Sequence, residues 1–475
     1  MKKTWSTSGL DLHLDVGGPR VRAALENALR EAVVSGRLAA DARLPSSRAL
    51  AGDLGISRNT VAEAYAQLVA EGWLVATLGS GTYVAALRQP PRVRPQLAPP
   101  PSQIRYDLRP GTPDVSSFPR SDWLAAMRQA LREAPDSAFG YGDLRGVPEL
   151  RDALAAYLAR ARGVRADPNH VVVCAGFTSG LWLVCKALAA RGSTSVVLEE
   201  YGLPSNSEVV ADAGLTVRRV SVDGEGAAVE QLAGMPDVSA VLLTPAHQFP
   251  LGVALSPTRR SRLIEWATTH GGLIIEDDYD GEFRFDRQPL GALQGLSPQR
   301  VLYAGTASKT LAPGLRLAWL VVPDHLLDGV LAAKTLTNRQ TSTVDQLALA
   351  AFIDNGRYDR HVRARRSAYR RRRDRLVEVM GRLPGQVSVT GIAAGLQAVV
   401  ELPPACSEVA VVNLASQKGL AVEGLGAYGP CGDGEAGPNT RHRPALALGY
   451  ANVPEHAFAS ALELLYEVIA EATGG

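Results

Sequence analysis

A proline-rich stretch at residues 85–104, AALRQPPRVRPQLAPPPSQI, separates two regular parts of the sequence. Proline fixes the backbone angle φ and has no N–H, so a run of prolines continues neither a helix nor a sheet and forms a semi-rigid, extended linker. The whole chain of 475 residues is also too long for one ordinary domain. We therefore expect a small domain at residues 12–84, a linker at residues 85–104 and a large domain at residues 105–475.

The part before the linker shows the pattern of three helices followed by a hairpin. Apolar residues recur at helical spacing in three segments, a glycine ends each of them, and serines precede the second and third. Two short runs around a Gly-rich turn then predict a pair of strands. We expect helices at residues 20–35, 49–54 and 58–72, strands at residues 73–78 and 82–84, and N-caps at Ser46 or Ser47 and at Ser57. This order of elements makes a winged helix.

The third predicted helix begins with side chains that can contact DNA. Hydroxyl, amide and guanidinium groups donate to phosphates and base edges, and a helix N-terminus itself favours a phosphate. Residues 1–104 carry 12 Lys and Arg against 8 Asp and Glu, which allows nucleic-acid binding. The same shape would also serve a protein-docking module with a solvated Arg face. The candidate DNA contacts are Arg48 before this helix, Ser57, Arg58, Asn59 and Thr60 at its start, and Gly79 in the hairpin turn.

The sequence LPSSRALAGDLGISRNTVAEAYAQLVAEGWLVATLGSGTYV, at residues 44–84, resembles the winged helix of GntR-type regulators over its whole length. The resemblance implies that the six candidate residues occupy DNA-contacting positions. Asp41 stands in the preceding turn, where this family usually has glycine.

Short apolar runs alternate with helical patterns after the linker. Strands that are apolar throughout are typical of a parallel sheet covered by helices on both faces. We therefore expect an α/β domain whose central sheet is mostly parallel. The expected strands start at Val171, Ser195, Ala240, Gly272, Val301 and Ala318, and helices are expected at residues 178–190 and 257–270 among others.

The sequence lacks the features of membrane, secreted, disulfide-rich and metal-binding proteins. It has no uninterrupted apolar run of about 18 residues, and no apolar run follows the lysines at its start, so we expect neither a membrane span nor a secretion signal. The four cysteines are widely spaced and form no CxxC pair, which argues against a disulfide framework or a metal site. We expect a cytoplasmic protein without a bound metal.

A lysine within a Gly, Thr and Ser cluster is a candidate for covalent binding of an aldehyde. The segment VLYAGTASKTLAPGLR, at residues 301–316, contains Lys309, which can form a Schiff base if its ammonium is partly desolvated. Thr306, Ser308 and Arg316 offer hydroxyls and a guanidinium to a phosphate. Taken alone, such a segment could also be an ordinary loop.

Two further segments offer matching partners. GGLIIEDDYD, at residues 271–280, reads as a buried strand that ends in carboxylates, and such a carboxylate can hold the protonated pyridine nitrogen of pyridoxal phosphate. Asp277 is the candidate for this role, and Tyr279 is the candidate partner of the ring hydroxyl; the alternative is a solvated acidic loop. The turn AGFTSG, at residues 175–180, leads into a helix, and its backbone amides with Thr178 form a candidate phosphate cradle.

These segments together resemble fold-type I aminotransferases, and with the winged helix they resemble the MocR subfamily of GntR-type regulators. The resemblance covers about residues 10–470 and is carried by YDLRPGTPDVSSFPR, FGYGDLRGVPELRDAL, TPAHQFPLG, IIEDDYDGEFRF, GTASKTLAPGLRLAW and ALALGYANV. It implies pyridoxal phosphate as the cofactor and a homodimer that buries the site. It also places His247 in a turn beside the cofactor, and we assign this histidine no chemistry. The residues it implies around the cofactor are Lys309 as the Schiff base, Asp277, Tyr279, Phe177 through its main chain, Thr178, Thr306, Ser308 and Arg316, with Tyr141 from the neighbouring subunit.

Two departures from the family pattern affect substrate binding more than cofactor binding. Where the family has a tyrosine that stacks on the cofactor ring, this sequence has Leu203, and Tyr201 could replace that tyrosine only if the backbone shifted. Where aminotransferases use a C-terminal arginine to grip a substrate carboxylate, the aligned position is Ala447, and Arg443 lies four residues earlier. Both differences favour a sensor of the cofactor itself.

The sequence thus predicts a DNA-binding transcription regulator whose effector domain binds pyridoxal phosphate. Cofactor binding would shift the protein between DNA-binding geometries. The resemblance favours the pyridoxine-biosynthesis regulators, which respond to pyridoxal phosphate, with an amino-acid effector as the variant. The alternative is an active aminotransferase with an accessory DNA-binding module, since a lysine for proton transfer is present. For a homodimeric regulator we expect paired half-sites in the operator and little catalytic turnover.

A dense run of arginines, RHVRARRSAYRRRRDR at residues 360–375, predicts a further helix. One interpretation is a packing helix whose Arg stems cover apolar surface. The other is an auxiliary DNA contact.

Overall fold

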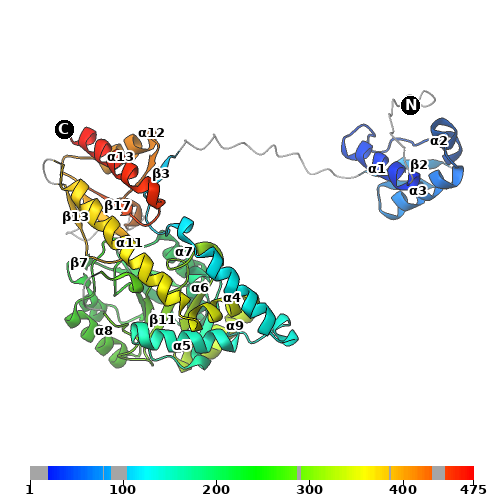
Figure 1. Cartoon of the computed structure of the whole chain (residues 1–475). Coiled ribbons are helices and arrows are strands. Elements are labelled where there is room, and N and C mark those ends of the chain that lie inside the picture. Colours follow the sequence, from blue (N-terminus) through cyan, green and yellow to red (C-terminus); the bar gives the residue numbers. More distant parts are fainter. Residues whose placement is uncertain are drawn as a thin grey trace. The chain divides into compact units, whose positions relative to one another are not determined.

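The structure is a computed structural model of the chain, and it describes residues 20–78, 80–86, 104–285, 290–383, 387–429 and 444–474. Contacts within the chain divide it into two compact units, Met1–Pro100 and Pro101–Gly475 (Figure 1). Most of the predicted linker, residues 87–103, lies outside the described residues. No helix in the described ranges is long and apolar enough to cross a membrane.

The described part of the first unit contains helices followed by a hairpin, as the sequence predicts. The apolar side of each helix packs into one common core, which accounts for the helical spacing of these residues. The core includes Leu25, Ala32, Leu50, Val61, Ala64, Leu68, Leu74 and Val84. The elements are α1 (Val21–Val34), α2 (Ser47–Leu54), α3 (Arg58–Ala70), β1 (Leu74–Thr77) and β2 (Gly81–Val84).

Serine N-caps start the second and third helices. The Ser46 hydroxyl accepts the Ala49 N–H at 3.2 Å, and the Ser57 hydroxyl accepts the Thr60 N–H at 3.1 Å. Each bond satisfies a backbone donor that the first turn of a helix leaves without a partner. Of the two candidate caps for α2, Ser46 takes the role, and Ser47 is the first helical residue.

A short extended segment pairs with the second strand of the hairpin, β2. The Leu44 N–H donates to the Thr82 carbonyl at 2.8 Å, and the Val84 N–H donates to the Ala42 carbonyl at 2.9 Å. Asp41, at the start of this segment, has a φ of 60°, in the left-handed region that favours glycine. This conformation explains the glycine usual at this position in GntR-type sequences, and aspartate is among the few other residues that tolerate it.

A seven-stranded sheet forms the centre of the second unit (Figure 1). Its strands lie in the order β4-β12-β11-β10-β9-β5-β6, and only β12 runs antiparallel to its neighbours. The prediction of a mostly parallel sheet is confirmed. The strands are β4 (Val171–Cys174), β5 (Ser195–Glu199), β6 (Thr216–Val220), β9 (Val238–Leu243), β10 (Leu273–Asp277), β11 (Val301–Thr306) and β12 (Ala318–Val321).

Both faces of this sheet are buried. Along β4, Val172 and Cys174 enter one hydrophobic core, and Val171 and Val173 enter another. Alternate side chains of one strand therefore need apolar surroundings on both sides, which is why the strands are apolar throughout. The helices of this part are α4 (Arg120–Glu133), α5 (Pro148–Arg162), α6 (Phe177–Ala190), α7 (Pro204–Asp212), α8 (Pro257–His270), α9 (Asp324–Thr335) and α10 (Thr343–Asp354).

A smaller antiparallel sheet follows in the last part of the chain, with strand order β13-β14-β17-β16. The long helix α11 (Arg357–Met380) leads into it and packs beside the last helix, α13 (Figure 1). The helix α11 contains the predicted basic helix at residues 360–375. The other elements here are β13 (Ser388–Thr390), β14 (Gln397–Glu401), β16 (Glu423–Gly424), β17 (Ala445–Gly449), α12 (Glu408–Gln417), α13 (Glu455–Thr473), and β15 (Leu420–Ala421), which pairs with β3 (Tyr106–Asp107).

Candidate functional site

A cavity of about 360 Å³ lies at the carboxyl ends of the parallel strands. Ligands of open α/β sheets bind at this edge. Residues at or just after the ends of β4, β5, β9, β10 and β11 all line the cavity, although they lie far apart in the sequence. It brings together all but one of the residues predicted around the cofactor: Phe177, Thr178, Asp277, Tyr279, Thr306, Ser308, Lys309 and Arg316.

Lys309 follows β11 and lines the cavity. Its Nζ donates a hydrogen bond to the Gly111 carbonyl oxygen. Burial lowers the pKa of Lys309, while the charges of Asp277 and Asp280 oppose that shift. The net direction favours the neutral amine, which is the form that attacks a carbonyl carbon. This position can therefore bind an aldehyde covalently.

Asp277 ends β10 and turns toward the cavity, while its neighbours in sequence face the protein. Glu276 accepts two backbone N–H groups at 2.8 and 3.0 Å, and Asp278 pairs with Arg162 at 2.6 Å. Burial raises the pKa of Asp277, and the charge of Lys309 opposes this shift. No donor among the described residues bonds to the Asp277 carboxylate. Its oxygens are thus available to a cationic N–H inside the cavity.

Arg316 and the start of α6 form a corner that suits an anion. A Cβ atom at Gly176 would lie 2.8 Å from the Arg316 guanidinium, so only glycine lets the guanidinium come so close to the helix N-terminus. At that N-terminus, Phe177 and Thr178 present backbone N–H groups that have no partner within the helix. Arg316 has no carboxylate partner among the described residues. A guanidinium and a helix N-terminus both favour negative charge, so this corner fits a phosphate.

The Tyr279 hydroxyl is already engaged by protein groups. It donates to the His247 carbonyl oxygen at 3.1 Å and accepts from the Gln397 side chain at 2.5 Å. His247 Nδ1 lies 2.8 Å from a carboxylate oxygen of Asp280. Tyr279 therefore lines the cavity as predicted, but its hydroxyl must change a partner to reach a ring hydroxyl. The sequence did not reveal Gln397, which arrives from β14, 118 residues further along the chain.

Leu203 and Tyr201 both line the cavity. Leu203 is 40% exposed beside the start of α7, whereas Tyr201 is 5% exposed and packs in an aromatic cluster with Phe249 and Tyr428. Ala447 belongs to the same cluster, is fully buried in β17 and brings no charge to this side of the cavity. Arg443, the other C-terminal candidate, lies outside the described residues.

Arg219, on β6, is a cavity residue that sequence reasoning missed. Its guanidinium donates to the Glu199 carbonyl oxygen at 3.1 Å and to the Ser207 hydroxyl at 2.8 Å. No carboxylate pairs with it in the part of the chain that the structure describes. Its place beside the cavity follows from the pairing of β5 with β6, for which no sequence motif gives a signal.

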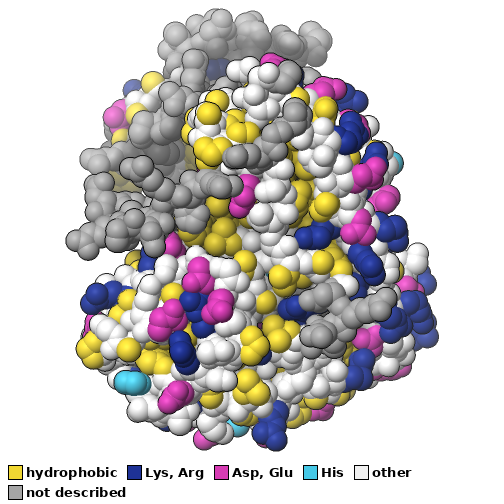
Figure 2. All heavy atoms as spheres, turned by 90° about the vertical axis from the view of Figure 1, so that its left-hand side faces the viewer, with side chains coloured by type: hydrophobic (Ala, Val, Ile, Leu, Met, Phe, Trp, Pro, Cys, Tyr) yellow, Lys and Arg dark blue, Asp and Glu magenta, His cyan; other side chains and the backbone are white. Residues whose placement is uncertain are grey.

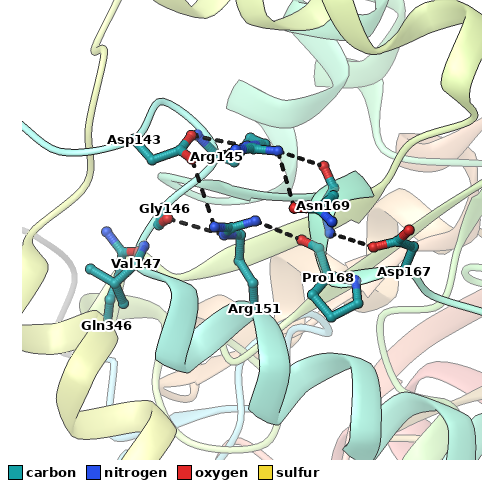
Figure 3. Close-up of polar contacts among 9 residues, drawn as sticks. All are labelled: Asp143, Arg145, Gly146, Val147, Arg151, Asp167, Pro168, Asn169 and Gln346. Carbon is teal, nitrogen blue, oxygen red and sulfur yellow. Dashed lines mark hydrogen bonds and ion pairs between the residues drawn. The ribbon is translucent and has the colours of Figure 1, made fainter.

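Tyr141 is the predicted cofactor residue that the cavity does not contain. Its side chain is 95% exposed. The segment after it is fixed by the polar contacts in Figure 3: Asp143 pairs with Arg145 at 2.6 Å, Arg151 donates to two backbone carbonyls at 3.2 and 2.9 Å, and Gln346 accepts a backbone N–H at 2.9 Å. The role of Tyr141 concerns the cavity of a neighbouring subunit and stays a prediction.

Of the predicted DNA contacts, Ser57, Arg58, Asn59 and Thr60 form the start of α3, and Arg48 lies in α2. The Ser57 hydroxyl serves as the N-cap and lies 3.0 Å from the Thr60 hydroxyl. Its first role is therefore to stabilise the start of the helix. Arg48 and Arg58 form no ion pair with an acidic side chain among the described residues. Gly79 lies outside the described residues. The exposed residues of the set are Arg48, Ser57, Arg58 and Asn59, and Thr60 is half-buried.

Comparisons with known proteins match both units. Residues 21–84 match the family described as "Bacterial regulatory proteins, gntR family", and residues 111–430 match "Aminotransferase class I and II". The chain is 33% identical over 437 residues to the probable rhizopine catabolism regulatory protein MocR of Rhizobium meliloti, with 86% of this chain and 87% of the relative covered. It is 33% identical over 411 residues to the HTH-type pyridoxine biosynthesis transcriptional regulator PdxR of Corynebacterium glutamicum. This match covers 85% of this chain and 88% of the relative.

Solved structures share the fold of the larger part of the chain. The multiple substrate aminotransferase of Thermococcus profundus has a TM-score of 0.69 at 25% identity and covers 82% of this chain and 97% of its own. The kynurenine aminotransferase of Pyrococcus horikoshii, solved with PMP, has a TM-score of 0.67 at 25% identity. The match covers 77% of this chain and 90% of that aminotransferase. The second unit therefore has the fold-type I aminotransferase architecture.

Proposed function

The chain belongs to the MocR subfamily of GntR-type transcription regulators, in which a winged helix precedes an aminotransferase class I and II domain, and we propose that its effector is pyridoxal phosphate. The observation that carries the proposal is the cavity that brings Lys309, Asp277 and Arg316 together. An amine, a carboxylate and an unpaired guanidinium complement the aldehyde, the pyridine nitrogen and the phosphate of this molecule. A relative named as a regulator of pyridoxine biosynthesis supports genes of vitamin B6 metabolism as the target.

The residues of the cavity fit the aldehyde, the ring nitrogen and the phosphate of this cofactor, while the Tyr279 hydroxyl would have to change a partner to bind the ring hydroxyl. Asp277 would hold the ring N–H, and the corner between α6 and Arg316 would hold the phosphate, with Thr178, Thr306 and Ser308 as hydroxyl donors. When bound, the cofactor supplies an aldehyde for covalent attachment to an amine and a ring that withdraws electrons. Lys309 would supply that amine, and burial already lowers the pKa of its ammonium.

We favour sensing over catalytic turnover because the described residues show no arginine at the C-terminal position where aminotransferases bind the carboxylate of an amino acid. Ala447 brings no guanidinium to the cavity, and Leu203 replaces an aromatic stacking partner. One observation favours the alternative, an active aminotransferase: Arg219 lines the cavity without a carboxylate partner among the described residues and could bind a substrate carboxylate. Steady amino-group transfer by the purified holo protein would support the enzyme.

We propose that the regulator is a homodimer that acts in the cytoplasm, where its operator lies. Tyr141 of one copy would complete the phosphate site of the other, because it is exposed and stands on a fixed turn. A dimer with a two-fold axis presents two winged helices and requires paired half-sites.

Covalent capture tests the effector site directly. The protein is incubated with pyridoxal phosphate, reduced with borohydride and digested, and the modified lysine is identified by mass spectrometry. We expect the adduct at Lys309. Lys334 is the matched control: burial also lowers the pKa of this lysine, but its Nζ donates to the Arg339 carbonyl at 2.8 Å and it does not line the cavity. Equal labelling of both lysines, or none at Lys309, would contradict the proposed site.

A further inference from the structure

Two sets can be distinguished among the arginines of α11. Arg372 is fully buried and pairs with Asp114 at 3.0 Å and with Glu455 at 2.8 Å. Arg366 and Arg373 donate to backbone carbonyls at 2.7 and 3.0 Å. These contacts hold α11 on the body of the second unit. The interpretation as a packing helix therefore accounts for this set.

The other set forms what we call the basic stripe: Arg360, Arg363, Arg370 and Arg371. All four are exposed. At 3.6 residues per turn they share one side of α11, opposite the side that carries Tyr358, Val362, Tyr369 and Leu376 into the core. None of the four pairs with an acidic side chain among the described residues.

The stripe carries more positive than negative charge. Asp374 is exposed on the same side of α11, three residues after Arg371 and four after Arg370, but no ion pair joins it to the stripe among the described residues. Over most of the face drawn in Figure 2, acidic side chains lie among the basic ones. Residues 105–475 as a whole carry 38 Lys and Arg against 40 Asp and Glu, so this part of the chain has no net positive charge. Like charges three or four residues apart on a helix repel one another by about 0.2–0.5 kcal/mol a pair. An anionic partner on this side would offset that repulsion.

We propose that the basic stripe is a second DNA-contact surface, which binds phosphates of the duplex that flanks the sites read by the winged helix. The inference rests on the proposed DNA-binding function. From Arg360 to Arg371 the helix rises by about 16 Å. One strand of B-DNA carries a phosphate every 3.4 Å or so along the axis, and roughly five phosphates therefore fit beside the stripe. Guanidinium groups suit them because each offers paired N–H donors.

The test compares two duplexes with the same operator. One ends at the outer edges of the half-sites, and the other continues for several helical turns on each side. The dissociation constant of the full-length protein is measured on both over a range of salt concentrations. For the wild type we expect a steeper salt dependence on the long duplex, by about 0.9 in the log–log slope for each phosphate contacted. In R360A/R363A/R370A/R371A this difference disappears, and binding to the long duplex weakens roughly tenfold at low salt, while binding to the short duplex stays the same.

Three variants separate the stripe from other effects. R375A/R382A removes two nearby arginines that already pair with Glu463, and we expect no change on either duplex. R360K/R363K/R370K/R371K keeps the charge and should keep the steep slope. Arg58→Ala should abolish specific binding to both duplexes. If Arg58→Ala has no effect, the proposed function is wrong. Equal slopes for the wild type on the two duplexes, or an unchanged slope in the four-alanine variant, would show that the stripe binds something other than flanking DNA.

Discussion

Lys309 and Asp277 show how burial and mutual attraction act on single residues of the cavity. Burial lowers the pKa of the lysine and raises that of the aspartate, and each partly offsets the shift of the other. When Lys309 is neutral or covalently bound to a ligand, the Asp277 carboxylate no longer has the Lys309 ammonium beside it. A protonated ring nitrogen at the same place would restore the pairing, so the two residues would act as one acceptor for a single ligand.

The lowered pKa of Lys309 predicts the pH dependence of its reaction. Since the folded value lies below the 10.5 of an ordinary lysine, the neutral amine becomes available at a lower pH than in the unfolded chain. We expect the initial rate of capture of pyridoxal phosphate at Lys309 to rise with pH through a midpoint below 10.5. Nα-acetyl-lysine serves as the reference amine. A midpoint equal to or above that of the reference would mean that the charges of Asp277 and Asp280 outweigh burial.

Asp41 allows a test of a single backbone angle. Its φ of 60° suits glycine, asparagine or aspartate and opposes a β-branched side chain. We expect Asp41→Val to lower the stability of the first unit by about 1–2 kcal/mol, and Asp41→Asn to change it by less than about 0.5 kcal/mol. Native-state hydrogen exchange of peptides from residues 21–84 in the full chain measures both. Equal protection in the two variants would show that the turn relaxes without strain.

At the scale of elements, the turn before α5, which follows Tyr141 in the sequence, depends on Gly146. The φ of Gly146 is 107°, and a Cβ atom at this residue would lie 2.6 Å from the Gln346 side-chain oxygen and 2.7 Å from a Val173 methyl. Gly146→Ala should therefore destabilise the second unit by about 2–4 kcal/mol, from backbone strain and overpacking together. Gly214→Ala is the control, because Gly214 also has a positive φ, 88°, but a Cβ atom at that position would meet nothing within 4 Å.

Thermal denaturation of the full chain distinguishes the two glycine variants. We expect Gly214→Ala to show only the cost of strain, about 1 kcal/mol, and Gly146→Ala to melt clearly earlier. If both melt at the same temperature, the contacts drawn in Figure 3 do not fix the turn.

The elements themselves were largely predictable, because local signals mark them. Serines and glycines bound the helices of the first unit, and the apolar runs coincide with the buried strands of the large sheet. The contacts between elements were not predictable. Gln397 and Arg219 reach the cavity through strand pairing, and Arg372 is buried in the basic run because it faces Asp114 and Glu455. Such positions depend on tertiary packing, for which a single sequence gives no periodic signal.

At the scale of the whole molecule, two units of different kinds share one chain. The first presents a helix N-terminus and arginines suited to DNA, and the second encloses a cavity suited to pyridoxal phosphate. A regulator needs the affinity at one site to depend on occupancy of the other, and linkage makes that dependence reciprocal. The sequence predicts both sites, whereas the coupling that we propose between them has no signal in a single sequence.

Operator affinity measured with and without pyridoxal phosphate, for the wild type and for Lys309→Ala, tests this coupling most directly. We predict that the cofactor changes the dissociation constant of the wild type by about 5- to 150-fold, the usual range for coupled sites, and leaves that of Lys309→Ala unchanged. Asp277→Asn should respond less than the wild type, since it weakens the grip on the ring nitrogen. A wild-type protein that carries the cofactor at Lys309 and yet binds its operator with the same affinity and footprint would contradict the account.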